Sequence, residues 1–401
     1  MRYIKTFCAI LSLLIGCAHI SYSQNNEALM ILIINPKNIG EASQIRGVAH
    51  SIKENRSASK QQFHIEEVES TDLVKAFTLL QKHNSNSKNL VIASGSDGVN
   101  ILREVKSKFP SIFSVHLSHQ IYNNSDSLLI TTHSPNGANL IVLPKHVITA
   151  KFESLLSSSK TKLLTTIGVA HNLSKSDIDK EYERHLLSIP GTTSDKYTLV
   201  ILGGDAQNTD QSWNYFTKSD ALKLAKQVGK FIYDDTYVFV LNGPRTGKHN
   251  PTTKEEDKNV HRNDMLDPVT QTFVDHFKAR EKFHVFDFQY GKTGMYKALL
   301  GKMLHASKSE IFVPGESTSM ISEIIDSVGS NEKHKIFVYE HSAMSKVHKT
   351  HISNEHRAGR INLVSKNGVI VKQITEKQFE HNSAAKSVAD DIIKNWVGNS
   401  K

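Results

Sequence analysis

The sequence predicts an α/β protein built from two Rossmann-like domains. Its 401 residues exceed the length of one ordinary domain, which is the first observation. The second is that short apolar runs, suited to buried parallel strands, alternate with stretches whose apolar residues recur at helical spacing. The third is a turn-rich stretch at 188–195, after which the alternation starts again. We therefore expect one domain over 24–190, a second over 196–375 and a closing C-terminal helix over 376–401.

The first predicted strand is Leu29–Ile34, an entirely apolar run that suits a strand buried on both faces. Asn35 and Pro36 end it, and the spacing of apolar residues predicts a helix over about 41–53. Further strands are expected at 63–68, 89–93, 112–117, 128–132, 139–143 and 163–167, and helices at 73–82 and 99–106.

The second half repeats this pattern. Its strands are expected at 197–202, 237–241, 284–288, 311–313, 335–339 and 368–371, and its helices at 219–231, 268–280 and 295–306 and after Ser319. The last stretch, 378–397, is amphipathic, with Val388, Ile392 and Trp396 on one side, and is the predicted closing helix.

Residues 1–23 have the pattern of a secretory signal peptide. Arg2 and Lys5 precede an apolar run that is short for a membrane span, and small residues lead up to Ser23. An alternative is a lipoprotein signal, because Leu14–Cys17 (LIGC) resembles a lipobox in which Cys17 would carry the lipid; an uncleaved anchor is the third interpretation. We expect an exported protein, periplasmic or secreted, that contacts a membrane only if Cys17 is lipidated.

The cysteine count and the charge exclude several kinds of site. Both cysteines, Cys8 and Cys17, lie in the signal segment, so the remaining chain has no disulfide, zinc–thiolate site or cysteine nucleophile. Removing that segment lowers the formal charge from +9 to 47 − 40 = +7. This basicity suits phosphate-bearing ligands, but it is spread without a polybasic block, which argues against a nucleic-acid partner. The 21 histidines form no HExxH motif, so we predict no metal site.

Loops at the carboxyl ends of the second-half strands suggest a phosphate site. Ile311–Val313 is followed by Pro314, a glycine and then three hydroxyl residues that open a helix, and such helix starts attract anions. On its own this stretch is equally a capped strand–helix turn. With glycines after the strand at 197–202 and a cation after the strand at 237–241, it suits a diphosphate and its ribose. The candidate residues are Gly203, Gly204, Arg245, Thr246, Ser317, Thr318, Ser319 and Glu323.

The first half offers a different kind of candidate. His171 follows Gly168 at the end of a predicted strand and is a candidate general base or hydrogen-bond donor, although a lone histidine is more often structural. The sequence contains no nucleophile elbow, no Walker A loop and no GxGxxG dinucleotide fingerprint.

Several segments, in their order, resemble the mitochondrial fission family named for the plant elongated-mitochondria protein. They are Gly40–Ala49, Thr166–Leu173, Val200–Gly204, Arg245–Thr246, the MYKALL segment from Met295, and Glu316–Glu323 (ESTSMISE). That family resembles GT-B glycosyltransferases, in which two Rossmann-like domains face a cleft and the second binds a nucleotide-sugar. The resemblance implies that Glu323 binds ribose. The family often has Gly-His where this chain has Gly40-Glu41, so Glu41 would take the place of a histidine base.

Three functions remain open. The first is transfer from a nucleotide-sugar to an envelope or host glycan or a lipid-linked acceptor, with Glu41 or His171 as base and no cofactor besides the donor. The second is a non-catalytic binding or interaction protein that keeps the fold. The export signal favours it, because nucleotide-sugars are made in the cytosol. The third is an exported solute-binding protein, against which the order of the motifs argues.

Overall fold

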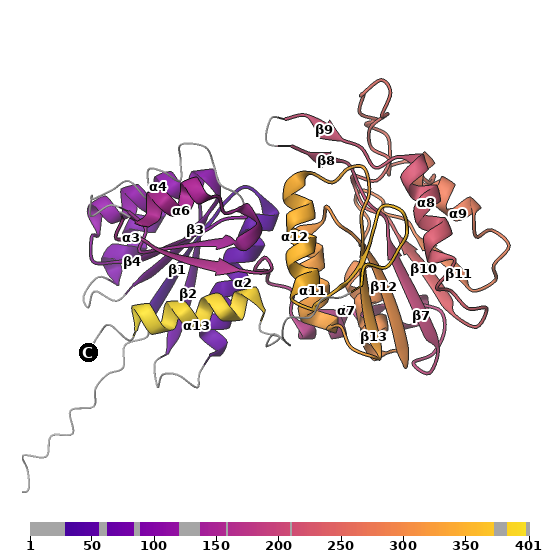
Figure 1. The fold of residues 1–401 in the computed structure, drawn as a ribbon. Helices are drawn as coiled ribbons and strands as arrows, with labels where there is room; N and C mark the ends of the chain where they lie inside the picture. Colours follow the sequence, from indigo (N-terminus) through magenta and orange to yellow (C-terminus); the bar gives the residue numbers. More distant parts are fainter. Residues whose placement is uncertain are drawn as a thin grey trace, which may run out of the picture.

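The computed structural model shows two α/β domains side by side (Figure 1). The structure describes residues 29–55, 62–83, 89–119, 137–157, 159–208, 211–372 and 383–397. The expected signal segment and the strand expected at 128–132 lie outside these ranges. Within them, no helix combines the length and the apolar character needed to cross a bilayer.

The first domain contains a parallel sheet with the strand order β2-β1-β3-β4-β5-β6. Its strands are β1 (Leu29–Asn35), β2 (Phe63–Glu69), β3 (Leu90–Ser94), β4 (Phe113–Leu117), β5 (Leu140–Pro144) and β6 (Lys162–Thr166). Leu32 and Ile34 of β1 face one core and Ile31 and Ile33 the other, so this strand is buried on both faces as its sequence predicts.

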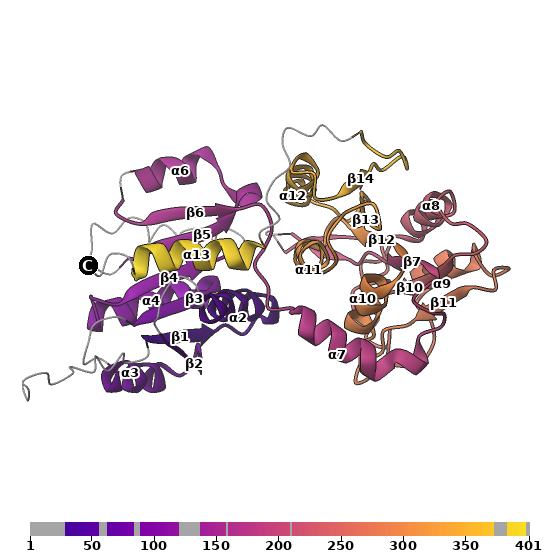
Figure 2. The same cartoon turned by 90° about the horizontal axis from the view of Figure 1, so that it is seen from below.

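Helices cover both faces of this sheet. On one face lie α3 (Leu73–Lys82), α4 (Gly95–Lys108) and α6 (Ala150–Ser157), and on the other α2 (Ile39–Glu54) and α13 (Ala384–Trp396). The closing helix α13 therefore returns from the end of the chain to the first domain, where Val388 and Ile392 are fully buried (Figure 2). The first domain is therefore built from two separate segments of the chain, and the second domain lies between them in the sequence.

The second domain repeats the design with the strand order β11-β10-β7-β12-β13-β14, again in parallel. Its strands are β7 (Lys196–Ile201), β10 (Tyr237–Leu241), β11 (Phe283–Phe286), β12 (Lys308–Pro314), β13 (His334–Tyr339) and β14 (Asn362–Val364). On one face lie α8 (Lys218–Val228) and α9 (Pro268–Asp275), and on the other α7 (Lys175–His185), α10 (Tyr296–His305), α11 (Thr318–Val328) and α12 (Lys346–Arg357). A short antiparallel hairpin, β8 (Ala206–Gln207) and β9 (Trp213–Asn214), follows the central strand β7.

The two parallel six-stranded sheets confirm the predicted fold class of two Rossmann-like domains. Helices α7 and α12 were not expected, because both are polar and bury few apolar side chains, such as Ile178 and Ile352. The prediction of a strand at 368–371 is also wrong. The edge strand is β14, and the chain then turns at Ser365 so that Ile370 only bridges back to Val364.

A strap of residues 167–174 joins the domains and runs against α2. Gly47 of α2 permits this approach, because a Cβ there would lie 2.0 Å from the carbonyl oxygen of His171. Beyond the strap, α7 packs in the core of the second sheet, where Tyr182 lies against Gly301 of α10. The chain thus enters the second core before the turn-rich stretch at 188–195.

The Gly47 contact yields a test of the strap. Replacing Gly47 with Ala should destabilise the protein by about 1–3 kcal/mol, because backbone of the strap has to move, and this outweighs the better helix propensity of Ala. Thermal unfolding should show a clearly lower midpoint. Gly294→Ala is the control, because a Cβ at Gly294 meets nothing within 4 Å. Equal midpoints for the two variants would contradict this account of the strap.

Candidate functional site

The strand order of the second sheet reverses between β7 and β12, and ligands of open α/β sheets bind outside the carboxyl ends of such strands. The loop after β7 contains Gly203 and Gly204, and the loop after β12 contains Gly315, Glu316 and Ser317. The structure therefore brings the predicted glycines and hydroxyl residues to the same end of the sheet.

Glu316, which the sequence did not identify as a site residue, fills the space between these loops. It is almost completely buried, and its Oε1 accepts the backbone N–H of Gly204 at 2.8 Å. Its Oε2 pairs with His341, which follows β13. Burial raises the pKa of Glu316, but His341, the Gly204 N–H and Arg245 outweigh burial and lower it below its usual value. The N–H group of Gly204 thus already donates a hydrogen bond to an ionised carboxylate.

The start of α11 keeps its own N–H groups available. Ser317 is the N-cap residue, but its side chain makes no capping hydrogen bond, contrary to what its position suggests. The N–H groups of Thr318 and Ser319 have no acceptor among the described residues, and both residues are half-buried. Because unpaired N–H groups at a helix start carry partial positive charge, this turn can bind an anion.

Arg245 follows β10 and lies next to Gly204. The Arg245 carbonyl accepts the N–H of Asp205 at 3.0 Å, and a Cβ at Gly204 would lie 2.8 Å from the Arg245 Cβ. The Arg245 side chain is exposed and forms no ion pair with a described residue. Thr246, in contrast, is buried and its hydroxyl accepts the N–H of Gly243 at 3.1 Å, while Gly203 packs beside the Phe216 ring. Thr246 and Gly203 therefore shape the loops, and Arg245 offers a charge.

Glu323 lies further along α11. Its Oε2 accepts the hydroxyl of Tyr296 at 3.0 Å, and burial raises the pKa of Glu323 against the opposing effects of His171 and Tyr296. The carboxylate is thus shared with a buried tyrosine, and a ribose contact at Glu323 stays a prediction.

Glu41 occupies the switch point of the first sheet, where β1 and β3 are neighbours. It is buried and follows the α2 cap Asn38, whose side chain accepts the N–H of Gly40 at 2.9 Å. Gly95, at a φ of +75° after β3, makes room for it, because a Cβ there would lie 2.3 Å from Glu41 Oε2. Nδ1 of His119 lies 3.7 Å from Glu41 Oε1, and burial lowers the pKa of His119 although Glu41 raises it.

His171 lies in the contact between the domains. Its Nε2 is 3.0 Å from Oδ2 of Asp326 on α11, and Arg360 donates to Oδ1 of the same carboxylate at 3.0 Å. Two residues earlier in the strap, the N–H of Val169 donates to the Ser322 hydroxyl at 2.9 Å. His171 is buried here and belongs to a polar network between the domains; a catalytic role for it stays a prediction.

A second polar group extends this contact. His351 and Glu355 of α12 are fully buried, and Nε of Arg360 lies 3.3 Å from Glu355 Oε2. The His351 ring packs on His146 of the first domain at a centroid distance of 4.6 Å. Burial raises the pKa of Glu355 to about 7 despite Arg360, and lowers that of His146 to about 4. Titratable side chains of both domains therefore contact each other here.

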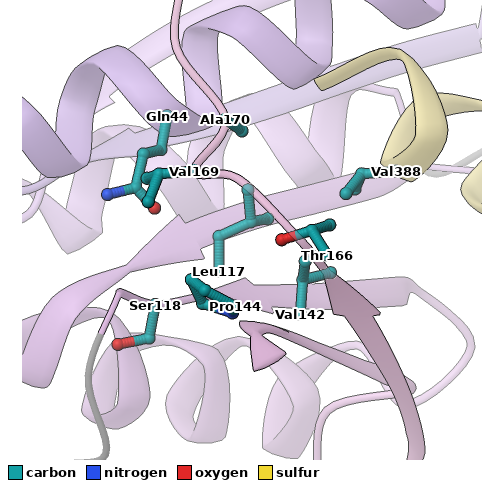
Figure 3. Close-up of a pocket in the computed structure, with 9 residues that line it drawn as sticks. All are labelled: Gln44, Leu117, Ser118, Val142, Pro144, Thr166, Val169, Ala170 and Val388. Atoms are coloured by element: carbon teal, nitrogen blue, oxygen red, sulfur yellow. The ribbon is translucent and has the colours of Figure 1, made fainter. Parts of the chain in front are cut away.

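The first domain contains a small cavity. It lies near the ends of β4, β5 and β6, under α2 and α13 (Figure 3). It is lined by Gln44, Leu117, Ser118, Val142, Pro144, Thr166, Val169, Ala170 and Val388. Its volume of about 10 Å³ has room for about one water molecule, far less than the roughly 300 Å³ at which small-molecule pockets begin. No group of three or more His, Cys, Asp or Glu side chains suited to a metal occurs in the described ranges.

The strap contact leads to a second prediction. Ser322→Ala should lower the unfolding free energy by about 1–3 kcal/mol, because the Val169 N–H would lose its acceptor in a buried place. Ser327→Ala on the same helix is the matched control and should change stability by less than about 0.5 kcal/mol. Chemical denaturation of both variants measures the difference, and equal losses would argue against the strap bond.

The Glu355 shift predicts a pH dependence. A pKa raised in the folded state means that the stability contributed by the group is complete below its ordinary value of 4.5 and is lost as pH rises through about 7. Glu355→Gln stays neutral at every pH. Its unfolding free energy, relative to that of the natural protein, should therefore increase by roughly 2–3 kcal/mol between pH 4.5 and 8. Unfolding free energies measured across this range check the gain. A stability difference that does not vary with pH would rule out the shift.

The family model described as Mitochondrial fission ELM1 matches residues 39–263, which is more than half of the chain. The curated proteins contain no significant match.

Three solved structures are similar to this chain over most of its length. A trehalose-6-phosphate phosphatase N-terminal domain from Candida albicans is 10% identical, with 93% of this chain and 97% of that chain covered and a TM-score of 0.45. A glycosyltransferase from Rickettsia africae is 10% identical, with 94% and 90% covered and a TM-score of 0.43. A UDP-forming trehalose-phosphate synthase from Burkholderia xenovorans, in complex with glucose-6-phosphate, is 7% identical, with 92% and 100% covered and a TM-score of 0.43. From the family match, the chain belongs to the Mitochondrial fission ELM1 family.

Proposed function

We propose that this protein is an exported, GT-B-like glycosyltransferase that uses a nucleotide-sugar. The observation that carries the proposal is that two features flank the bond between Glu316 and Gly204 at the second switch point. One is the start of α11, with two N–H groups that have no acceptor among the described residues, and the other is the exposed Arg245 beside Gly204. N–H groups at a helix start and a guanidinium are complementary to a diphosphate. The glycosyl group attached to it would lie on the side of the first domain.

The transfer needs a base and a stabilised leaving group. Glu41, at the first switch point with His119, would accept the proton of the acceptor hydroxyl, and the oxygen would then attack the anomeric carbon. As this bond forms, the bond from the anomeric carbon to the diphosphate breaks, and Arg245 with the α11 turn stabilises the departing charge. The acceptor is a glycan of the envelope or of a host, or a lipid-linked sugar.

A non-catalytic binding protein is the second candidate, and one observation favours it. Glu316 holds the Gly204 N–H that a diphosphate would otherwise use, so the switch point offers fewer donors than its glycines suggest. Such a site would suit a phosphorylated small molecule or glycan that is bound without turnover. The two candidate functions differ in catalysis by Glu41, which the transferase requires and the binding protein lacks.

A nucleotide screen tests the proposal. UDP, GDP, CMP and their sugars are added at millimolar concentration to the protein from Gln24 onward, and thermal unfolding is followed. A ligand at 100 times its dissociation constant should add about 2.7 kcal/mol of stability. No stabilisation by any of them would reject the transferase.

The Arg245 contribution is tested on the nucleotide that binds. Arg245→Ala should weaken it by roughly 10- to 100-fold, the usual effect of losing a charge-assisted hydrogen bond. Arg262→Ala removes the same charge from a neighbouring exposed loop and should change the affinity by less than threefold, which calorimetry resolves. An equal effect of both would mean that only overall charge matters. Glu41→Gln should abolish transfer and leave nucleotide affinity unchanged.

A further inference from the structure

A histidine held by a buried carboxylate lies directly beside the proposed diphosphate site. Oδ2 of Asp205 is 2.9 Å from Nδ1 of His249, and both side chains are more than nine-tenths buried. The N–H of Asp205 donates to the Arg245 carbonyl at 3.0 Å, and Asp205 follows Gly204 in the chain. The pair is thus fixed to the two loops that form the anion site, and the reaction described above does not use it.

The hydrogen bonds of Asp205 decide which nitrogen of His249 carries the proton. The carboxylate accepts two backbone N–H groups, from Phe216 at 3.0 Å and from His249 at 3.0 Å. An ionised Asp205 can only accept, so its bond to the ring then requires a proton on Nδ1. In the neutral ring, Nε2 then has a lone pair, and it forms no hydrogen bond to any described residue.

Two aromatic side chains of the neighbouring hairpin lie against the same ring. The centroid of Trp213 is 4.5 Å and that of Tyr215 is 5.9 Å from His249, and both residues are half-buried. Figure 1 shows strands β8 and β9 leaving the second domain on the side of the first domain. A hydrogen-bond acceptor beside aromatic rings suits a ligand with hydroxyl donors and an apolar ring face.

We propose that His249, oriented by Asp205, binds a hydroxyl of the glycosyl group of the nucleotide-sugar. The glycosyl group is attached to the diphosphate, and the pair lies next to Gly204 and Arg245. This inference rests on the proposed function and adds a residue that selects for the sugar.

The experiment compares a nucleotide with its sugar conjugate. Dissociation constants of UDP, UDP-glucose, GDP and GDP-mannose are measured by calorimetry for the natural protein, His249→Phe and His261→Phe. His261 is the matched control, because it is a buried histidine whose Nε2 bonds the Thr246 carbonyl at 2.8 Å in the same region. His249→Phe should weaken the nucleotide-sugar about five- to tenfold and the nucleotide less than twofold. His261→Phe should weaken both alike.

The outcomes separate this inference from the proposed function. Binding of neither ligand by the natural protein would overturn both. Binding of both ligands, with an equal loss for each in His249→Phe, would overturn only the sugar contact. A nitrogen-15 NMR spectrum of the unliganded natural protein tests the orientation independently of any ligand: we expect His249 protonated on Nδ1, and a neutral ring protonated on Nε2 would overturn the inference.

Discussion

The buried carboxylate of Glu316 joins the ends of three neighbouring strands. It follows β12, accepts the N–H of Gly204 after β7 and pairs with His341 after β13. Asp205 extends the connection to β10 through the Arg245 carbonyl. Because a buried charge is stable only when it is paired and hydrogen-bonded, the three loops have to keep their positions around it. The start of α11 and the Arg245 side chain are thereby presented on the open side of a rigid switch point.

The domains meet through a different chemistry. The strap, α11 and the end of α12 bring four ionisable side chains together, namely those of His171, Asp326, Arg360 and Glu355. Each ionisable group removed from water has to be compensated by a partner, so this contact is more sensitive to pH than the apolar cores of either sheet. The proposed transfer, with Glu41 in one domain and Arg245 in the other, requires this contact to hold the two domains together.

Sequence patterns predicted those strands and helices whose formation depends on residues adjacent in the chain. Leu29–Ile34 and Ile311–Val313 are strands because apolar runs before a turn bury both faces, and the hydroxyl residues after Gly315 do open a helix. The pairing of Glu316 with His341 and of Asp205 with His249 depends on loops 25 and 44 residues apart, so no local pattern reveals it. The polar helix α12 was missed because its burial comes from histidines and Glu355 rather than from an apolar stripe.

In the proposed function an anion binds to the first turn of α11 and to Arg245 while Glu316 keeps the Gly204 N–H. A crystal structure of the protein with UDP tests this arrangement. We expect the diphosphate within hydrogen-bond distance of the Thr318 and Ser319 N–H groups and the Arg245 guanidinium, with Glu316 still bonded to Gly204 and His341. A diphosphate that displaces Glu316 from Gly204, or that binds away from α11, would contradict it.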